Sequence, residues 1–330
     1  ARDGDAIILA DGTYEGAGNT VLDFKGKKIH VRSANGPEQC ILDGADTAKG
    51  FHFHRRENSD AVVAGLTLVR CTPAVYCSRS SPTVRNCVIE SNSGENGGGI
   101  YLNTSVAVLK ELTLTGNMAL SGGGVYGTVS FPAITNCVIS GNLATNGGGI
   151  FLNFSSPKIT NCSLYGNAGR AILCWGSSPT VVNSILWGNS PGSIGKNTTS
   201  NPSVIFSDIE DGYPGQGNLD ANPKFTDVVQ GNYSLQRTSP CLDAGSNDNA
   251  PPGDRDGTSR PQDGNGDGTA VTDMGAYELI LSNLKVSPRG GWEVYGMEGG
   301  PFSPGTKEFS VINTGENPLS WLVTWVQAGL

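Results

Sequence analysis

Apolar residues occur in short alternating runs along most of the chain. The runs "GIYLN" from Gly99, "GVYGT" from Gly124 and "GIFLN" from Gly149 place apolar side chains at every second position. A period of two is typical of β-strands with one buried face, and none of the runs is long enough for a helix. Glycine, Ser-Pro and Asn-Gly separate the runs and predict turns. We therefore expect short strands joined by tight turns.

These runs recur at a fixed interval. One column of equivalent positions advances in steps of 25, 25, 25 and 22 residues and comprises Val75, Ile100, Val125, Ile150 and Ile172. Two further columns keep the same steps: Cys87, Leu112, Cys137, Cys162 and Ser184, and Asn92, Asn117, Asn142, Asn167 and Asn189. A fixed period of this length indicates a repeat architecture. If equivalent residues of successive repeats stack in parallel, the fold is all-β. We predict a right-handed parallel β-helix (solenoid) with coils about 4.8 Å apart. By that spacing, about ten coils fit between Asp5 and Glu278.

The repeat also predicts what lies inside the coils. Asn86, Asn136, Asn161 and Asn183 precede the cysteine column, and we expect their amides to stack as an Asn ladder along the axis. The cysteines in that column should behave as small interior hydrophobes with free, buried thiols. The even total of eight cysteines leaves disulfides open as an alternative, most of all for those outside the column.

Several segments resemble known families. "SPCLDAGSNDNAPPGDRDGTSRPQDGNGDGTAVTDMGAYE", residues 239–278, together with "NSILWGN" and "GPEQCILDG", resembles secreted bacterial right-handed β-helix proteins of the choice-of-anchor Q domain group. This resemblance covers roughly residues 1–280 and implies the fold and an extracellular or cell-surface location. "GGPFSPGTKEFSVINTGENPLSW" is similar to the start of immunoglobulin-like, BACON-type modules. We therefore expect a β-helix over residues 1–280 and an incomplete immunoglobulin-like β-sandwich over 281–330.

Composition narrows the possible functions. The chain has 330 residues, with 22 Lys and Arg against 30 Asp and Glu, for a net charge of −8. Nucleic-acid binding needs a basic face and is not expected. No apolar run is long enough to predict a transmembrane segment. The chain opens with "ARDGDAIILADGTYEG", which reads as the middle of a domain. We expect further residues upstream, among which an export signal is one option.

Calcium is the cofactor that the sequence suggests. "DGNGDG" places oxygen-bearing side chains on alternate residues before a glycine, as at the start of a calcium-binding loop. Met274 stands where such a loop carries its bidentate Glu, and Asp273 is one residue early. The candidate ligands of a structural calcium ion are Asp254, Asp256, Asp263, Asn265, Asp267 and Asp273. A solvated Asp-Gly turn cluster is the alternative.

The alternation that buries Val75 places aromatic residues on the outer face of the same strands. We expect the following side chains to stack at steps of about 5 Å: Tyr76, Tyr101, Tyr126 and Phe151, with His52 one coil earlier. An exposed aromatic row marks a candidate binding face. Three interpretations remain open: a platform for sugar rings, a protein contact that includes lateral contact between rods, and a strip covered by a loop or by the C-terminal module.

A weaker candidate site lies in "FHFHRRE", residues 51–57. His54 and Arg56, with Arg79 one coil later, offer the basic groups with which polysaccharide lyases accept a proton and neutralise a uronate. Against this, Lys158 is the only charged residue between Leu112 and Ser163. The paired carboxylates of a hydrolase are therefore missing from the central coils. Ordinary polar surface residues are the simpler interpretation.

Together these patterns predict a non-catalytic extracellular scaffold or adhesive surface protein. End-to-end self-assembly into fibres is a hypothesis, because the open ends of a solenoid expose unpaired strand edges. The alternative is a polysaccharide-binding or polysaccharide-cleaving, lyase-type β-helix enzyme. The expected partners are copies of the chain itself or a polysaccharide.

Overall fold

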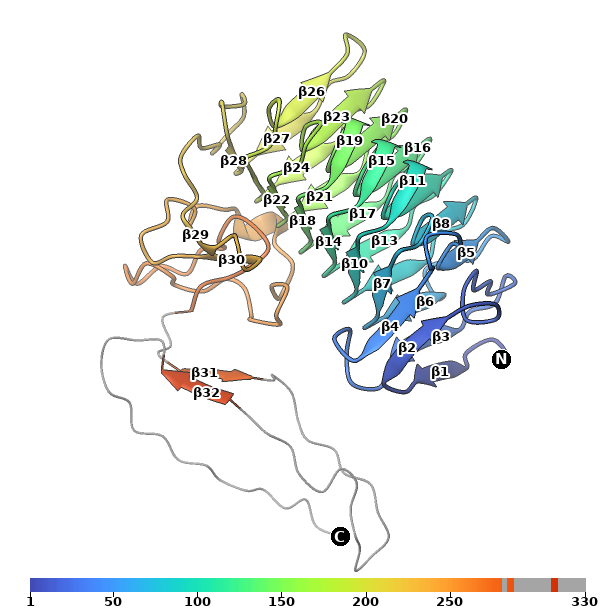
Figure 1. Ribbon diagram of the computed structural model, residues 1–330. Coiled ribbons are helices and arrows are strands. Elements are labelled where there is room, and N and C mark those ends of the chain that lie inside the picture. Colours follow the sequence, from blue (N-terminus) through green and yellow to red (C-terminus); the bar gives the residue numbers. More distant parts are fainter. Residues whose placement is uncertain (281–283, 288–309, 314–330) are drawn as a thin grey trace, which may run out of the picture. The chain divides into compact units, whose positions relative to one another are not determined.

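The computed structural model describes residues 1–280, 284–287 and 310–313. The chain divides into two compact units, Ala1–Leu279 and Ile280–Leu330. The first is a parallel β-helix of the right-handed type, which confirms the predicted fold (Figure 1). No helix among the described residues is long and apolar enough to cross a membrane.

Two long parallel sheets, named sheet A and sheet B, run the length of the solenoid. Sheet A consists of β1 (Ala6–Leu9), β3 (His30–Ser33), β6 (Val62–Ala64), β9 (Thr83–Arg85), β13 (Val108–Lys110), β17 (Ala133–Thr135), β21 (Lys158–Thr160), β24 (Thr180–Val182) and β27 (Ser203–Ile205). Sheet B consists of β2 (Gly12–Glu15), β4 (Cys40–Asp43), β7 (Thr67–Val69), β10 (Val88–Glu90), β14 (Thr113–Thr115), β18 (Val138–Ser140), β22 (Ser163–Tyr165), β25 (Ile185–Trp187) and β28 (Asp208–Ile209). With nine strands in each sheet, the expectation of about ten coils reaching Glu278 was wrong.

Two shorter parallel sheets complete the coils. Sheet C consists of β5 (Phe51–Phe53), β8 (Val75–Ser78), β12 (Ile100–Asn103), β16 (Val125–Thr128), β20 (Ile150–Asn153), β23 (Ile172–Trp175) and β26 (Ile194–Lys196). Sheet D has three strands in the central coils, β11 (Ser93–Asn96), β15 (Met118–Ser121) and β19 (Leu143–Asn146). A complete central coil thus runs through sheets D, C, A and B in turn.

The register agrees with the sequence columns. Ile100 pairs with Val75 and Val125, and Ile150 pairs with Val125 and Ile172. These side chains are all buried, as are the members of the cysteine column, which are three cysteines, one leucine and one serine. All eight cysteines are free and buried, so the thiols add to the apolar core.

The Asn ladder forms from a different column than expected. The buried amides of Asn92, Asn117, Asn142, Asn167 and Asn189 each bond to the next, with Nδ2–Oδ1 distances of 2.9 to 3.0 Å. The column before the cysteines forms only one such bond, from Asn183 Nδ2 to Asn161 Oδ1 at 3.3 Å, because its members have a φ of about +50° at an outer corner of each coil. A left-handed backbone turns those side chains outward. Asn is one of the few residues that adopt this backbone conformation readily.

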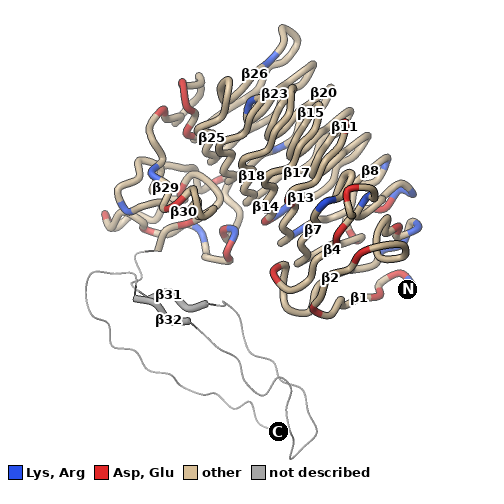
Figure 2. Tube along the Cα trace, in the orientation of Figure 1, with Lys and Arg blue, Asp and Glu red and all other residues tan. Residues whose placement is uncertain are grey.

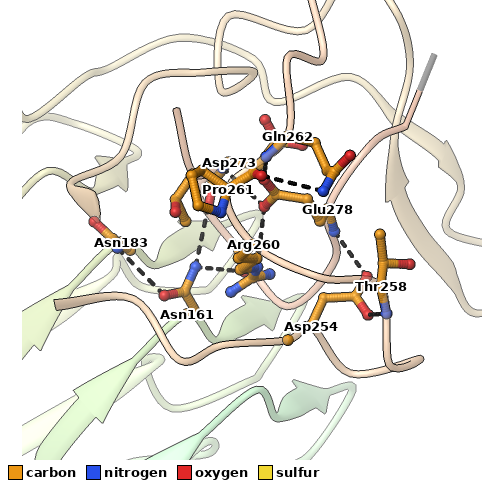
Figure 3. Close-up of polar contacts among 12 residues, drawn as sticks. Asn161, Asn183, Asp254, Thr258, Arg260, Pro261, Gln262, Asp273 and Glu278 are labelled. Carbon is orange, nitrogen blue, oxygen red and sulfur yellow. Dashed lines mark hydrogen bonds and ion pairs between the residues drawn. The ribbon is translucent and has the colours of Figure 1, made fainter. Parts of the chain in front are cut away.

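After β28 the chain turns back along the solenoid instead of extending it. Residues 220–279, here called the side cover, contain β29 (Phe225–Asp227), β30 (Asn232–Leu235) and the 3₁₀ turn η1 (Asn247–Asn249). The outward Asn column holds this segment: Asn161 Nδ2 donates to the carbonyl of Asp273 at 3.0 Å (Figure 3), and Asn183 Nδ2 to that of Ser246 at 2.9 Å. The side cover therefore packs across several coils on the sheet B side.

Nine residues of the second unit are described, namely Ile280 and two short strands. The strands form an antiparallel pair, β31 (Leu284–Ser287) with β32 (Ser310–Asn313). The expected immunoglobulin-like module otherwise lies outside the described residues and stays a prediction.

Candidate functional site

A continuous stack of aromatic rings follows the outer face of sheet C. Tyr76, Tyr101, Tyr126 and Phe151 are paired in register on adjacent strands. Their ring centroids are 4.6, 5.4 and 5.5 Å apart, with interplanar angles of 10°, 3° and 26°. His52 adjoins Tyr76 edge-on at 5.1 Å. The predicted row of aromatic residues is thus one stack along the axis.

The stack leaves mainly ring edges, rather than ring faces, to solvent. Neighbouring rings cover each other's faces, and the three tyrosines are only partly exposed. Burial, followed by the neighbouring hydroxyls of Tyr76 and Tyr126, raises the pKa of Tyr101. A sugar platform needs free ring faces against which a pyranose can pack. The geometry therefore favours a contact with apolar groups over the sugar platform.

Phe151 differs from the expectation because it is buried, with only 4% of its surface exposed. Trp175 packs edge-on against it, with ring centroids 5.5 Å apart at 71°. Trp175 aligns in register with Asn153 and not with Phe151. The repeat pattern alone therefore gave no sign that the tryptophan ends the stack.

Exposed apolar side chains border the stack on both sides. Between sheets C and A, five large side chains are 48% to 65% exposed and are called here the corner patch: Val106, Val129, Phe131, Phe154 and Trp175. On sheet D, Met118, Leu120 and Leu143 are 50% to 55% exposed, and Met118 pairs directly with Leu143. We call the stack with these two margins the sheet C face. Contiguous exposed apolar surface of this kind marks an interaction site.

The backbone of the corner patch is strained. Val129 has a φ of 48° and Phe154 a φ of 49°, in the left-handed region that disfavours branched and bulky residues. In the next coil the corner position is a glycine, Gly176. Such strain tends to concentrate at functional sites. Sequence reasoning missed these two residues because nothing in the strand pattern reports a corner dihedral angle.

Charge is distributed unevenly along the solenoid. The charged residues lie mostly in the N-terminal coils and the side cover, and the central coils contain almost none (Figure 2). Lys158, the one charged residue between 112 and 163, lies on sheet A. The central part of the sheet C face is therefore uncharged.

A charged cluster lies at the N-terminal end of the ring stack. His54 Nε2 lies 3.3 Å from Asp23 Oδ2 and Arg55 Nε lies 3.5 Å from the same oxygen, while Lys49 Nζ sits 5.0 Å from the centre of the Tyr76 ring. The His52 and His54 rings stack at 4.2 Å. Burial, with the positive charges of His54 and Lys49, lowers the pKa of His52. The cluster thus gathers several basic groups, two of which are paired with Asp23.

The three candidate lyase residues do not converge. His54 is paired with Asp23, and Arg56 and Arg79 are exposed at corners with φ values of 63° and 53°. Within residues 1–280, no hydrogen bond or ion pair links the His54 side chain to Arg56 or Arg79.

The six candidate calcium ligands fall into separate places. Asp263 accepts hydrogen bonds from the backbone N–H groups of Gly266 and Gly268 at 2.7 and 3.0 Å, within an exposed turn that also contains Asn265 and Asp267. Asp254 and Asp273 are buried elsewhere in the side cover, and Asp256 is exposed. No group of three or more metal-binding side chains occurs among the described residues. Asp243 accepts hydrogen bonds from further backbone N–H groups of the turn, those of Gly264 and Asn265. The calcium site stays a prediction.

Instead, the buried acids form an ion-pair network in the side cover. Glu278 Oε2 lies 3.0 Å from Arg260 Nε and accepts the Asp273 N–H at 3.0 Å (Figure 3). The pKa of Asp273 and of Glu278 is raised to about 7, mainly by burial, with a contribution from a neighbouring carboxylate in each case. This network holds the side cover together.

Comparisons with known proteins add little beyond the fold. No family model matches the chain, and no curated protein matches it. Among solved structures, the crystal structure of pectate lyase Pel9A is similar with a TM-score of 0.47 and 15% identity, over 85% of this chain and 89% of that chain.

Proposed function

We propose that the protein is a non-catalytic scaffold, extracellular or on the cell surface, that associates side by side with a second copy of itself through the sheet C face. The observation that carries this proposal is the corner patch. Its side chains are about half exposed, and two of them are held in strained backbone at the same corner of consecutive coils. Burying them in a contact would recover the apolar area left exposed by the monomer.

Charge supports a second copy as the partner. Two chains that each carry a net charge of −8 repel one another, unless they meet where charge is absent. The central coils offer such a surface. A two-fold axis would set one sheet C face against the other, so that each apolar margin meets its counterpart.

The ends of the solenoid support sideways association better than fibres. At the C-terminal end, the N–H groups of Phe206 and Ile209 donate to the carbonyls of Gln216 and Leu219 at 2.8 and 3.0 Å. These donors are thus used within the chain. The strand β1 is the first strand of sheet A among the described residues. End-to-end assembly stays a hypothesis.

The test replaces Val129 and Phe154 by Asn, which adopts a left-handed backbone more readily. We expect sedimentation velocity to show dimers of the unaltered chain and monomers of the Val129→Asn, Phe154→Asn variant, with thermal stability equal or higher. Val229→Asn is the matched control, because Val229 is 87% exposed in the side cover. A chain that stays monomeric at high concentration, or a variant that dimerises equally well, contradicts the proposal.

A second candidate function is the binding of an acidic polysaccharide at the N-terminal cluster. It is favoured by the stacked His52 and His54 rings and the adjacent Lys49 and Arg55. Such binding should weaken with salt and with His54→Gln and Arg79→Gln, measured by affinity electrophoresis in acidic and neutral polysaccharides. Release of unsaturated products would extend it to lyase activity. Equal mobility in both polysaccharides rules it out.

A further inference from the structure

A pocket lies between the outer face of sheet B and the side cover, away from the sheet C face. Its volume is about 330 Å³ and its walls are Tyr165, Trp187, Phe225 and Val228, with Asn222, Pro223, Lys224 and Gln236 around them. Tyr165 and Trp187 come from adjacent strands and pair in register. Phe225 belongs to the β29–β30 hairpin and meets Tyr165 edge-on at 5.8 Å.

The polar rim of this pocket is fixed in place. Lys224 N–H donates to Asn222 Oδ1 at 2.9 Å, and Gln236 Nε2 donates to the Phe225 carbonyl at 3.0 Å. The Lys224 ammonium donates to the Thr238 carbonyl at 2.9 Å. Ser239 Oγ donates to the carbonyl of Pro223 at 2.6 Å. The pocket is therefore preformed, which reduces the entropy lost on binding.

The unused groups of the rim define the ligand that would fit. Lys224 makes no ion pair within residues 1–280, and two of its N–H groups remain after the bond to Thr238. The Asn222 amide nitrogen and the Gln236 amide oxygen also remain available, as a donor and an acceptor. Aromatic walls with amides and a single cation suit a small ring that has an apolar face, hydroxyl groups and a negative charge.

We propose that this pocket binds one sugar ring that carries a carboxylate. The ring packs against Trp187 and Phe225, its hydroxyls bond to the amides of Asn222 and Gln236, and its carboxylate pairs with Lys224. The volume lies at the lower end of the range for small-molecule sites, which fits a single ring with its substituents. This site is independent of the proposed association through the sheet C face.

The experiment titrates the full chain with glucuronate and with glucose as the neutral counterpart, using NMR of the Trp indole and backbone amide signals. We expect glucuronate to shift the signals of Trp187 and Lys224 while those of Trp175 stay in place. Lys224→Gln should weaken binding about tenfold, since it removes one charge-assisted hydrogen bond. Lys224→Arg keeps the charge and should bind within a few-fold of the unaltered chain.

Lys158→Gln is the charge-matched control, because Lys158 is exposed on sheet A, outside the pocket. It should bind glucuronate as the unaltered chain does. Any one of three results overturns the proposal: no shift at saturating glucuronate, equal binding of glucose and glucuronate, or equal loss in the Lys224→Gln and Lys158→Gln variants.

Discussion

The ring of Phe154 lies over Gly176 in the next coil, so close that a Cβ atom on Gly176 would come within 2.8 Å of it. Both residues have left-handed backbone, with φ of 49° and 59°. The glycine therefore makes room for an exposed aromatic side chain on a corner that disfavours one. This relationship ties the corner patch to a specific backbone position in the neighbouring coil.

Replacing Gly176 by Ala should therefore both destabilise the fold and displace Phe154. We expect a loss of about 1 kcal/mol from the left-handed backbone alone, and a further loss from the contact with the ring. Gly166→Ala is the matched control, because Gly166 has a φ of 63° and nothing within 4 Å of its Cβ position. Chemical denaturation measures both, and equal losses would show that the ring contact has no energetic weight.

The Asn ladder should carry more stability than an ordinary surface amide. Asn142 accepts from the Asn117 backbone and side chain at 3.0 and 2.9 Å and donates to the Leu114 carbonyl at 3.0 Å, all fully buried. Asn142→Ala leaves these groups without partners, and we expect a loss of about 3 kcal/mol in the free energy of unfolding.

Asn146→Ala provides the comparison for the ladder. Asn146 is only partly buried and donates to Ser121 Oγ at 3.2 Å. Its loss should stay below about 1 kcal/mol by urea denaturation. Similar losses for Asn142→Ala and Asn146→Ala would mean that the ladder follows from the stacking of coils and does not stabilise it.

The thiols should be inert in the folded protein. All eight are buried, and burial raises the pKa of Cys71 and of Cys174 to about 12 and that of Cys87 to about 11. Because the thiolate is the reactive form, we expect no alkylation by iodoacetamide under native conditions and eight labels after denaturation, counted by mass spectrometry. A fast-labelling cysteine in the native protein would contradict the buried arrangement.

The fold could be predicted from the sequence because the repeat specifies which residues stack on one another in adjacent coils. Val75, Ile100 and Val125 recur at one interval, and parallel pairing in register is the arrangement that buries all of them. The interval could not tell which Asn column points inward. That depends on the corner dihedral angles, which left-handed Asn136 and Asn161 reveal only in the structure.

The candidate site was less predictable for the same reason. The alternation placed Tyr76, Tyr101 and Tyr126 on one face, as found. Whether their rings offer faces or edges depends on side-chain rotation, which the alternation does not specify. The pocket beside Trp187 joins residues as far apart in the sequence as Tyr165 and Gln236, from different elements, and it forms only because the side cover turns back.

The side cover should loosen as pH rises through about 7. Burial raises the pKa of Asp273 and of Glu278 to about 7, well above the values of unfolded chains. Protonation is therefore favoured in the folded state, so the stabilising contribution is complete below a pH of about 4 and is lost as pH rises through 7. Arg260 neutralises part of the resulting charge, while Asp243 and Asp254 add to it.

Hydrogen exchange measures this effect at two amides of the side cover, one bonded within the side cover and one bonded to the solenoid. Met274 N–H donates to the Cys241 carbonyl and Gly275 N–H to that of Asn183, at 3.0 and 2.8 Å. We expect the protection of both amides, corrected for intrinsic exchange, to fall between roughly pH 5 and 8, the window that the two pKa values set. The Asn142 amide should stay protected over the same range. Asp273→Asn removes one titrating group and should flatten this profile even if it lowers protection at every pH. The prediction attributes the pH dependence to the buried carboxylates. A profile that is flat in the unaltered chain, or equally steep in the variant, would therefore contradict it.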